Sequence, residues 1–459
     1  MTKSIKQNIN MLEGPLFKNI ILYTVPIMLT GVLQLLFNAA DLVVVGQFCG
    51  STSVAAVGAT NALTNLLVNL FLGFSAGAGV IMANALGAKD DDDAHKTIHT
   101  AMLLAICGGV ILTAVGVSAS EPLLNLMGTP DDVIGLSAVY MRIYFGGIVS
   151  MLVYNFGAAM LRAAGDTRSP LVYLTISGVV NVILNLFFVT VFNMNVAGVA
   201  LATTISQAVS AFLVVLRLIK RNDACRFYVT KMRFHKKQLI KILKIGFPAG
   251  IQGSMFSISN VIIQSSVNSF GAAAVSGASA ASSIEGFIYI VMNAFHQTGL
   301  NFAGQNAGAG NFKRIKKIAF ISLMSVAVTG IIGGGLMYIF KTQLLGIYIT
   351  NSPEAISYGV IKLTFIGLPY FVCGVMDTTT GLLRGLGSSF APMLITVFGT
   401  CGFRILWIYT VFARYHSFEL LMSSYIISWL LTLSIELVLL LHILKKREKK
   451  YGKAAPLKT

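Results

Sequence analysis

Apolar runs long enough to cross a lipid bilayer recur along nearly the whole chain. A membrane-spanning helix needs about 20 mostly apolar residues. Charged residues make up only 11% of the chain and hydrophobic residues 55%, whereas soluble proteins carry about 25% charged residues. So little charge cannot coat a surface that faces water. The sequence therefore predicts an all-α membrane protein with twelve transmembrane helices, over 17–46, 54–86, 95–119, 134–161, 169–191, 196–219, 239–269, 273–305, 315–340, 355–383, 389–413 and 418–444.

Basic residues alternate between the loops. The net charge is +17, and Lys and Arg concentrate in 217–244 and in the runs after the eighth and twelfth spans, while the loops after the first, fifth and seventh spans have none. The positive-inside rule predicts a multi-pass protein of the cell membrane with both termini and the central loop in the cytoplasm. Because the basic runs lie between apolar spans, we expect no nucleic-acid partner.

The two halves of the chain repeat each other at an offset of 222 residues. The stretch LRAAGDTRSP (161–170) recurs as LRGLGSSFAP (383–392), and Pro26, Gly31 and Asn38 recur as Pro248, Gly253 and Asn260. Pro26, Pro248 and Pro369 lie inside spans, where we expect them to kink helices rather than end the spans. An offset that holds over about 140 residues indicates an internal duplication of the kind found in transporters.

The duplication predicts the domain organisation. Each half contains an even number of spans, so both copies enter the membrane in the same orientation, with substrate sites near the midplane between them. We expect two pseudo-symmetric six-helix lobes, 1–219 and 239–459, joined by a cytoplasmic linker at 220–238, with a basic cytoplasmic tail after the last span. A receptor or a membrane enzyme needs no such duplication, so the sequence predicts a transporter that is not an enzyme.

Polar residues follow one face of several spans at steps of three or four. These stripes comprise Thr30, Gln34, Asn38 and Asp41; Asn61, Asn65 and Asn69; Ser177, Asn181 and Asn185; and Glu285, Tyr289, Asn293, Gln297, Asn301 and Gln305. Such side chains can join helices through hydrogen bonds worth about 0.6 kcal/mol each, or they can line a cavity. Long stripes in both halves favour a cavity. We predict a substrate cavity lined by Gln34, Asn38, Glu285, Asn293, Gln297, Asn301 and Asp377.

Four acids lie within the spans and away from their ends: Asp41, Glu285, Asp377 and Glu436. A charge at the bilayer centre costs about 2.5–3.5 kcal/mol, so an intramembrane acid is a candidate functional residue. Asp41 ends a polar stripe and is the best candidate for ion coupling. Glu285 could attract a cationic substrate or pair with a base inside its lobe. Glu436 lies among leucines and fits an interfacial or packing role.

The sequence offers little for catalysis or metal binding. The acids of 90–93 are consecutive, which fits a charged run that caps a helix rather than a metal site. His95 and His99 are one helical turn apart but have no evident third ligand, and no nucleophile lies beside a base. We therefore expect no catalytic residues, no metal site and no cofactor.

Three stretches resemble one known family. VPIMLTGVLQLLFNAADLVVVG (25–46), the paired LRAAGDTRSP and LRGLGSSFAP, and FAGQNAGAGNFKR (302–314) resemble bacterial multidrug and toxic compound extrusion (MATE) transporters, over residues 15–445. The resemblance implies a V-shaped pair of lobes that exports cationic or amphipathic compounds against H⁺ or Na⁺ by alternating access. On that basis we expect small-molecule drugs and the lipid bilayer as partners, and a monomer.

The resemblance also implies an ion-coupling site of Asp41, Asn181, Asn185 and Thr203. Asp41 matches the family's acid in the first span, Asn181 the first polar residue of an N-x-x-x-D pattern, and Thr203 a threonine of the sixth span. Asn185 departs from the pattern, because many members carry Asp there, and the coupling ion is left open between H⁺ and Na⁺. Phe256 stands where some members carry a glutamate, so we expect no sodium site of that kind in the second lobe.

The alternative function is that of a lipid-linked oligosaccharide flippase from the same superfamily. Such a protein would need several bases in its cavity to bind pyrophosphate. Away from the ends of the spans, the only bases are Arg142, Lys362 and Arg404, which favours the drug transporter.

Overall fold

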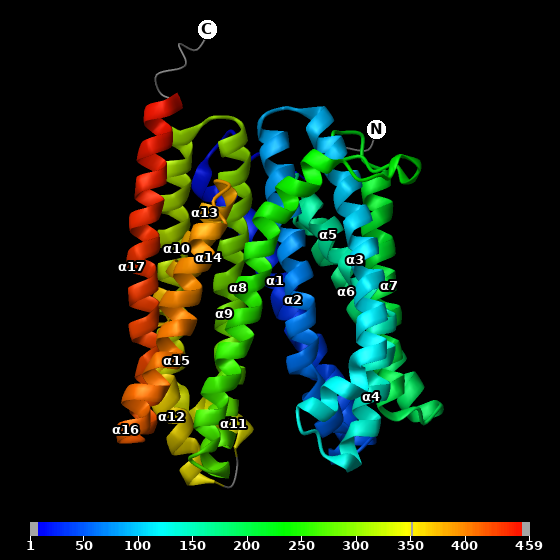
Figure 1. The fold of residues 1–459 in the computed structure, drawn as a ribbon, viewed down its shortest axis with the longest axis vertical. Coiled ribbons are helices and arrows are strands. Elements are labelled where there is room, and N and C mark those ends of the chain that lie inside the picture. Colours follow the sequence, from blue (N-terminus) through cyan, green and yellow to red (C-terminus); the bar gives the residue numbers. More distant parts are fainter. Residues whose placement is uncertain (1–7, 350–351, 452–459) are drawn as a thin grey trace. The chain divides into compact units, whose positions relative to one another are not determined.

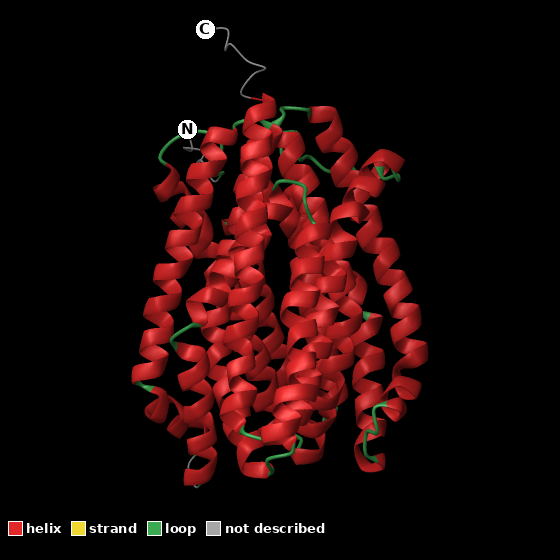
Figure 2. Cartoon of the chain, turned by 60° about the vertical axis from the view of Figure 1, so that its left-hand side comes forward, coloured by secondary structure: helices red, strands yellow, loops and turns green. Residues whose placement is uncertain are grey.

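The computed structural model describes residues 8–349 and 352–451, so the ends of the two predicted cytoplasmic termini lie outside the described residues. Every regular element within those ranges is a helix (Figure 2), which confirms the predicted all-α class. The α-helices (Figure 1) are α1 (Leu16–Phe48), α2 (Ser51–Gly87), α3 (Asp91–Leu126), α4 (Asp131–Gly146), α5 (Ile148–Ala163), α6 (Arg168–Leu186), α7 (Asn195–Ile219), α8 (Lys236–Asn268), α9 (Ala272–Gly308), α10 (Phe312–Ile339), α11 (Lys341–Tyr348), α12 (Pro353–Gly367), α13 (Tyr370–Gly385), α14 (Phe390–Thr396), α15 (Phe403–Trp407), α16 (Ala413–Tyr415) and α17 (Phe418–Tyr451). Short π-helical segments η1 (Phe187–Val191), η3 (Val397–Gly402) and η4 (Ile408–Phe412) and a 3₁₀ turn η2 (Val229–Lys231) complete the fold.

Helices cover all twelve regions in which the sequence predicts spans. Among the described residues, nine continuous helices are long and apolar enough to cross a membrane, and two bent helix pairs, α4 with α5 and α12 with α13, bring the count to eleven. The remaining predicted span, 239–269, lies in α8, which has 33 residues but does not meet the same measure of hydropathy. Beyond its first turns, which carry four lysines, the helix still contains many Gly, Ser, Gln and Asn residues, and these lower its mean hydropathy.

The two halves repeat each other in their helix lengths and bends. Both α1 and α8 have 33 residues and contain a proline, Pro26 or Pro248, and both α2 and α9 have 37 residues. The bent pairs turn by 48° and 50°, and Pro369 lies at the second bend, as predicted. The repeated glycines Gly165 and Gly387 have φ angles of 84° and 82°. A residue with a side chain is strained in this left-handed conformation, which explains why both copies of the motif keep glycine.

The chain forms two compact units: unit 1 contains residues 1–10 and 29–254, and unit 2 contains residues 11–28 and 255–459. In unit 1 the first half of α8 packs against α2 through glycines. A Cβ atom placed on Gly73 would lie 2.3 Å from the backbone nitrogen of Gly250, and one on Gly77 would lie 2.6 Å from the carbonyl oxygen of Ile242. These glycines belong to GFSAGAG (73–79), and such close backbone approach is the packing expected of small residues in a membrane.

In unit 2 the first half of α1 packs against α9. The Thr24 hydroxyl lies 2.8 Å from that of Thr298, and the Tyr23 ring meets the Phe302 ring edge-on at 5.3 Å between centroids. The predicted lobes, 1–219 and 239–459, follow the order of the chain, whereas each compact unit includes half of a helix from the other repeat. The lobe limits therefore stay a prediction.

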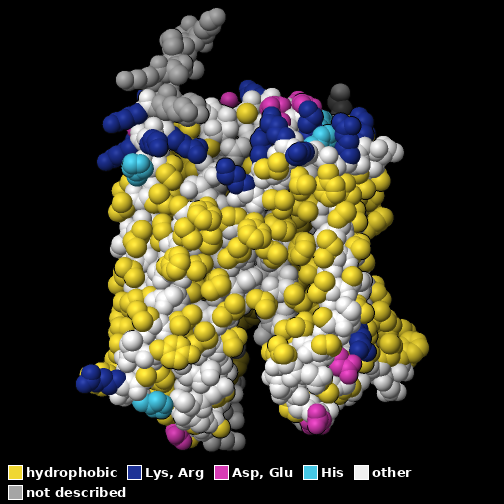
Figure 3. All heavy atoms as spheres, in the orientation of Figure 1, with side chains coloured by type: hydrophobic (Ala, Val, Ile, Leu, Met, Phe, Trp, Pro, Cys, Tyr) yellow, Lys and Arg dark blue, Asp and Glu magenta, His cyan; other side chains and the backbone are white. Residues whose placement is uncertain are grey.

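Within each unit most of the Lys and Arg side chains gather at one end of the helices (Figure 3). In unit 1 this end carries the linker, and in unit 2 it carries the start of α10 and the end of α17. The apolar side chains cover the length of the helices between the ends. This separation fits helices whose middle parts face lipid.

Candidate ion-coupling site

Four polar side chains from three helices of unit 1 form a cluster centred on Asp41. Asp41 comes from α1, Asn181 and Asn185 from α6, and Thr203 from α7. Asn181 and Asn185 share one face of α6 because they are one helical turn apart. Both are buried, with 5% and 0% of their surface exposed. The structure therefore brings together the four residues of the predicted ion-coupling site.

The hydrogen bonds of this cluster converge on the Asp41 carboxylate. The Asn185 side-chain amide donates to Asp41 Oδ1 and also to Asn181 Oδ1, the latter at 3.2 Å. The Thr203 hydroxyl donates to Asp41 Oδ2 at 3.4 Å, and Asn181 Nδ2 donates to Thr203 Oγ1 at 3.4 Å. Each carboxylate oxygen thus accepts a hydrogen bond, which stabilises the charged form of the acid.

A cavity of about 60 Å³ adjoins the Asp41 cluster. About 10–15 Å³ by this measure accommodates one water, so several waters or a hydrated ion fit. Gln34 and Asn38 line this cavity, as does Asp41. The buried Oδ1 of Asn185 accepts no hydrogen bond from the described residues. An acceptor of this kind, beside a carboxylate, is a suitable ligand for a small cation.

Several further residues, which the sequence did not single out, line the same cavity. Asn155 contributes from α5, and Ser206, Gln207 and Ser210 contribute from α7. Thr203, Gln207 and Ser210 follow one another at steps of four and three, so they form a polar stripe on α7 like those recognised on α1 and α6. The same spacing rule could have found them.

In unit 2 the predicted cavity residue Glu285 pairs with a base. Its Oε1 lies 3.7 Å from Lys362 Nζ, and the two side chains are only 13% and 8% exposed. Lys362 also donates to the carbonyl oxygen of Ala278 at 3.2 Å and to the Ser282 hydroxyl. The geometry therefore favours the second role that the sequence left open for Glu285, which is pairing with a base inside its own unit.

The other predicted cavity residues of unit 2 differ in exposure. Asn293, Gln297 and Asp377 are partly exposed, whereas Asn301 is only 2% exposed. The Asn301 amide donates to the carbonyl oxygen of Gln297 at 2.8 Å. Tyr289, from the same stripe, lies near the side chain of Asp377. The stripe of α9 thus begins at partly exposed positions and ends inside unit 2.

Glu436 is fully buried in unit 2 and is held by threonines. The Thr380 hydroxyl lies 2.9 Å and 3.0 Å from its two carboxylate oxygens, and the Thr396 hydroxyl donates to Oε1 at 3.0 Å. Its surroundings are polar rather than a cluster of leucines, because α13 and α14 present these threonines to α17. The threonine run at 378–380, which includes Thr380, was the sequence signal for a polar environment around this buried carboxylate.

Comparison with known proteins identifies relatives over most of the chain. The MatE family model matches residues 26–187 and 248–410, and the starts of its two matches differ by the 222 residues of the internal repeat. The probable multidrug resistance protein YpnP of Bacillus subtilis is 30% identical over 84% of this chain and 86% of its own length. The probable multidrug resistance protein NorM of Thermotoga maritima is 28% identical over 83% of this chain and 82% of its own length.

Solved structures share the fold. A crystal structure of a MATE protein in the bent conformation aligns with 98% of this chain and 100% of its own, with a TM-score of 0.89 and 20% sequence identity. At that identity the agreement concerns the fold alone, and it covers the helices that carry Asp41, Asn181, Asn185 and Thr203.

Proposed function

Because the chain belongs to the MatE family of multidrug and toxic compound extrusion transporters, we propose that it exports cationic or amphipathic drugs in exchange for H⁺ or Na⁺ by alternating access. Relatives named as multidrug resistance proteins support the substrate class. The single observation that carries the coupling mechanism is the Asp41 cluster, which holds one carboxylate among amide and hydroxyl groups beside a small cavity.

The cluster supports coupling because it can hold either of two states. With Asp41 charged, the donors from Asn185 and Thr203 or a bound cation stabilise the carboxylate. With Asp41 protonated, the cation is released and the hydrogen bonds weaken. An ion drives a transport cycle only if it binds two conformations with different affinity. Residues from three helices allow that difference, since small helix movements change the distances around Asp41.

The intramembrane bases argue against the flippase alternative. Lys362 pairs with Glu285, and Arg142 lies 2.8 Å from Glu121. Arg404 is buried, donates to the Ser428 hydroxyl at 2.9 Å and lies over the ring of Tyr425. All three already have partners inside their own unit. A pyrophosphate would therefore have to displace existing contacts.

The test of coupling is Asp41→Asn in proteoliposomes with an imposed proton or sodium gradient. We expect gradient-driven dye transport to be lost, while the amount of folded protein stays unchanged, because Asn cannot exchange a proton or neutralise a cation. The matched control is Asp131→Asn, which removes an exposed acid from the first turn of α4. Full gradient-driven transport in Asp41→Asn would remove this residue from the mechanism.

The choice of ion needs a separate experiment. With one carboxylate in the cluster, we propose that protons suffice, so transport should persist without sodium when the proton gradient is directed inward. Strict dependence on sodium would overturn this. The oxygens of Asp41, Asn181, Asn185 and Thr203 would then act as ligands for the cation.

A further inference from the structure

A second and larger cavity lies at the basic end of unit 1, away from the Asp41 cluster. It has a volume of about 600 Å³ and lies between the first turns of α3 and the linker of residues 220–235. We call it the linker cavity. Its walls include His95 and Lys96 from α3 and Tyr228, Lys231, Arg233 and His235 from the linker. Figure 3 shows basic and histidine side chains together at this end of the unit.

The linker cavity carries an excess of positive charge. Lys96, Lys231 and Arg233 contribute three permanent cations, and the one acid in the wall is Asp92, which pairs with Lys96. Lys231 and Arg233 are exposed, so their head groups can reach a ligand. Arg offers a planar fork and Lys a point charge, and both bind phosphate oxygens through charge-assisted hydrogen bonds.

Tyr228 adds an aromatic surface to this basic wall. Lys231 Nζ lies 4.8 Å from the centroid of the Tyr228 ring, and the His99 ring is parallel to it within 9°. His99 is itself fixed, because its Nδ1 bonds the carbonyl oxygen of His95 at 2.6 Å and its Nε2 accepts from the backbone N–H of Tyr228 at 3.1 Å. His99 therefore orients the wall and has no ring nitrogen left for a ligand.

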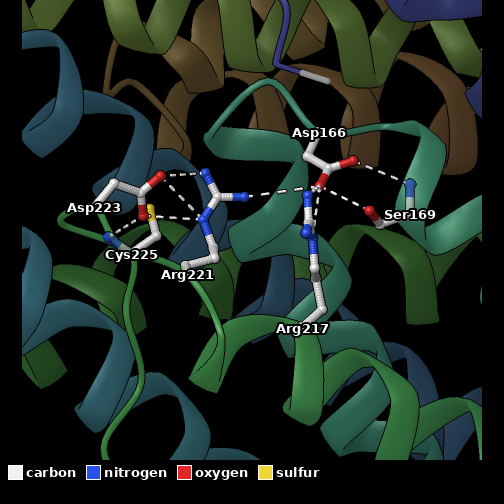
Figure 4. Close-up of polar contacts among 6 residues, drawn as sticks. All are labelled: Asp166, Ser169, Arg217, Arg221, Asp223 and Cys225. Carbon is white, nitrogen blue, oxygen red and sulfur yellow. Dashed lines mark hydrogen bonds and ion pairs between the residues drawn. The ribbon is translucent and has the colours of Figure 1, made fainter. Parts of the chain in front are cut away.

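A buried charge cluster anchors the linker that forms this wall (Figure 4). Asp166 is fully buried and accepts hydrogen bonds from the backbone and hydroxyl of Ser169, while Arg217 and Arg221 lie 3.3 Å and 3.7 Å from its Oδ2. Arg221 also pairs with Asp223 in the linker. Burial alone would raise the pKa of Asp223, but Arg221 holds it below its usual range. These contacts fix the linker before any ligand binds.

The anchor is confined to the first half of the chain. At the offset of 222 residues, Ser388 stands where Asp166 stands in the first half, and Leu439 and Ile443 replace Arg217 and Arg221. A transport mechanism shared by both repeats does not require this cluster. Because the cluster is present in the first repeat alone, it points to a role that is specific to the linker.

We propose that the linker cavity binds a phosphate ester of nucleotide size, with its phosphate groups on Lys96, Lys231 and Arg233 and its organic part against Tyr228. The volume falls within the roughly 300–1,000 Å³ that is usual for small-molecule sites, and one inorganic phosphate would leave most of it empty. Two sources share this chemistry: a soluble nucleotide, and the headgroup of an anionic phospholipid at the membrane surface.

The binding should depend on pH through His235. Burial lowers the pKa of His235, and the nearby Arg233, Lys96 and His99 lower it further. Asp92 has the opposite effect and raises this pKa. A bound anion raises the pKa of His235 again. Between the pKa of the free protein and that of the complex, binding is therefore accompanied by uptake of a proton. Affinity should therefore rise as the pH falls towards and below the usual histidine pKa of about 6.5.

The test compares two double variants of the full-length protein. Lys231→Gln with Arg233→Gln removes two charges from the cavity, and Lys313→Gln with Lys317→Gln removes two exposed charges from α10 in unit 2. ATP and inorganic phosphate are titrated into protein in neutral detergent, and lipid retention is measured in nanodiscs of phosphatidylglycerol or phosphatidylcholine. Melting temperatures check that all variants are folded.

We expect at least a tenfold loss of affinity in the cavity variant and no change in the α10 variant. Saturable ATP binding that is tighter than phosphate binding supports the soluble source. Selective retention of phosphatidylglycerol without ATP binding supports the lipid source. The proposal is overturned if neither ATP nor phosphatidylglycerol binds, or if both double variants bind as well as the parent protein.

Discussion

Glu285→Gln should destabilise the protein, because it leaves Lys362 buried without its counter-charge. The two charged atoms are 3.7 Å apart. Coulomb's law gives about 4.5 kcal/mol at that distance with an effective dielectric constant of about 20. Removing one partner of a buried pair typically costs about 3–5 kcal/mol, which agrees. Both side chains are largely buried, so screening by solvent reduces this figure little.

Thermal unfolding in detergent, followed by intrinsic fluorescence, measures the effect. A loss of about 4 kcal/mol corresponds to a fall in melting temperature of roughly 10 °C for a unit of this size. Glu354→Gln is the matched control, because Glu354 is an exposed acid in the same unit. Adding Lys362→Met to Glu285→Gln should recover most of the stability, since an apolar side chain needs no counter-charge.

Transport assays on the same variant separate the two roles of Glu285. A structural pair predicts equal losses for cationic and neutral dyes, in proportion to the loss of folded protein. An unchanged melting temperature together with a selective loss of cationic dyes would refute the pairing argument. Glu285 would then be a substrate contact, as the polar stripe on α9 first suggested.

Three further variants test the fold, the site and the linker. Gly77→Val should prevent stable packing of α2 on α8 and lower the melting temperature, because its Cβ would lie 2.6 Å from a backbone oxygen. Its control is Gly58→Ala, at a position with open space, which should keep or slightly raise the melting temperature. Asn185→Asp places a second carboxylate beside the first, so transport should become stimulated by sodium in a rate measurement at fixed pH. Asp166→Asn removes an acid that lies beside both Arg217 and Arg221, and trypsin should then cut the linker of 220–235 several-fold faster than in the parent protein.

The sequence predicts the helices and their repeat well because both depend on local information. Hydropathy over about 20 residues locates a span wherever apolar residues dominate, and it is weakest at α8, where Gly, Ser, Gln and Asn interrupt the apolar residues. The repeated glycines Gly165 and Gly387 follow from a conformation that only glycine adopts readily. Such constraints are imposed by the residue itself and its neighbours, so they are visible in a single sequence.

The grouping of the helices into units is harder to predict. The polar stripe of α1, from Thr30 to Asp41, lies in its second half, so the first half of the helix carries no stripe that identifies its partner in unit 2. Gly73 and Gly77 mark a surface of close contact, but nothing in the sequence identifies the first half of α8 as the helix that fills it. The exchange of half-helices between the repeats is therefore a property of tertiary packing.

The partners of the polar side chains are also hard to predict, because they depend on which helices pack together. Helical spacing places Asn181 and Asn185 on one face, and it also predicts a stripe from Glu285 onwards. Spacing alone does not distinguish a stripe that lines a cavity from one whose members have partners within the unit. Lys362 is far from Glu285 in the chain and lies close to it only because α12 packs against α9. A polar stripe in a membrane helix therefore indicates that partners exist, and the packing of the neighbouring helices decides whether they are water, an ion or another side chain.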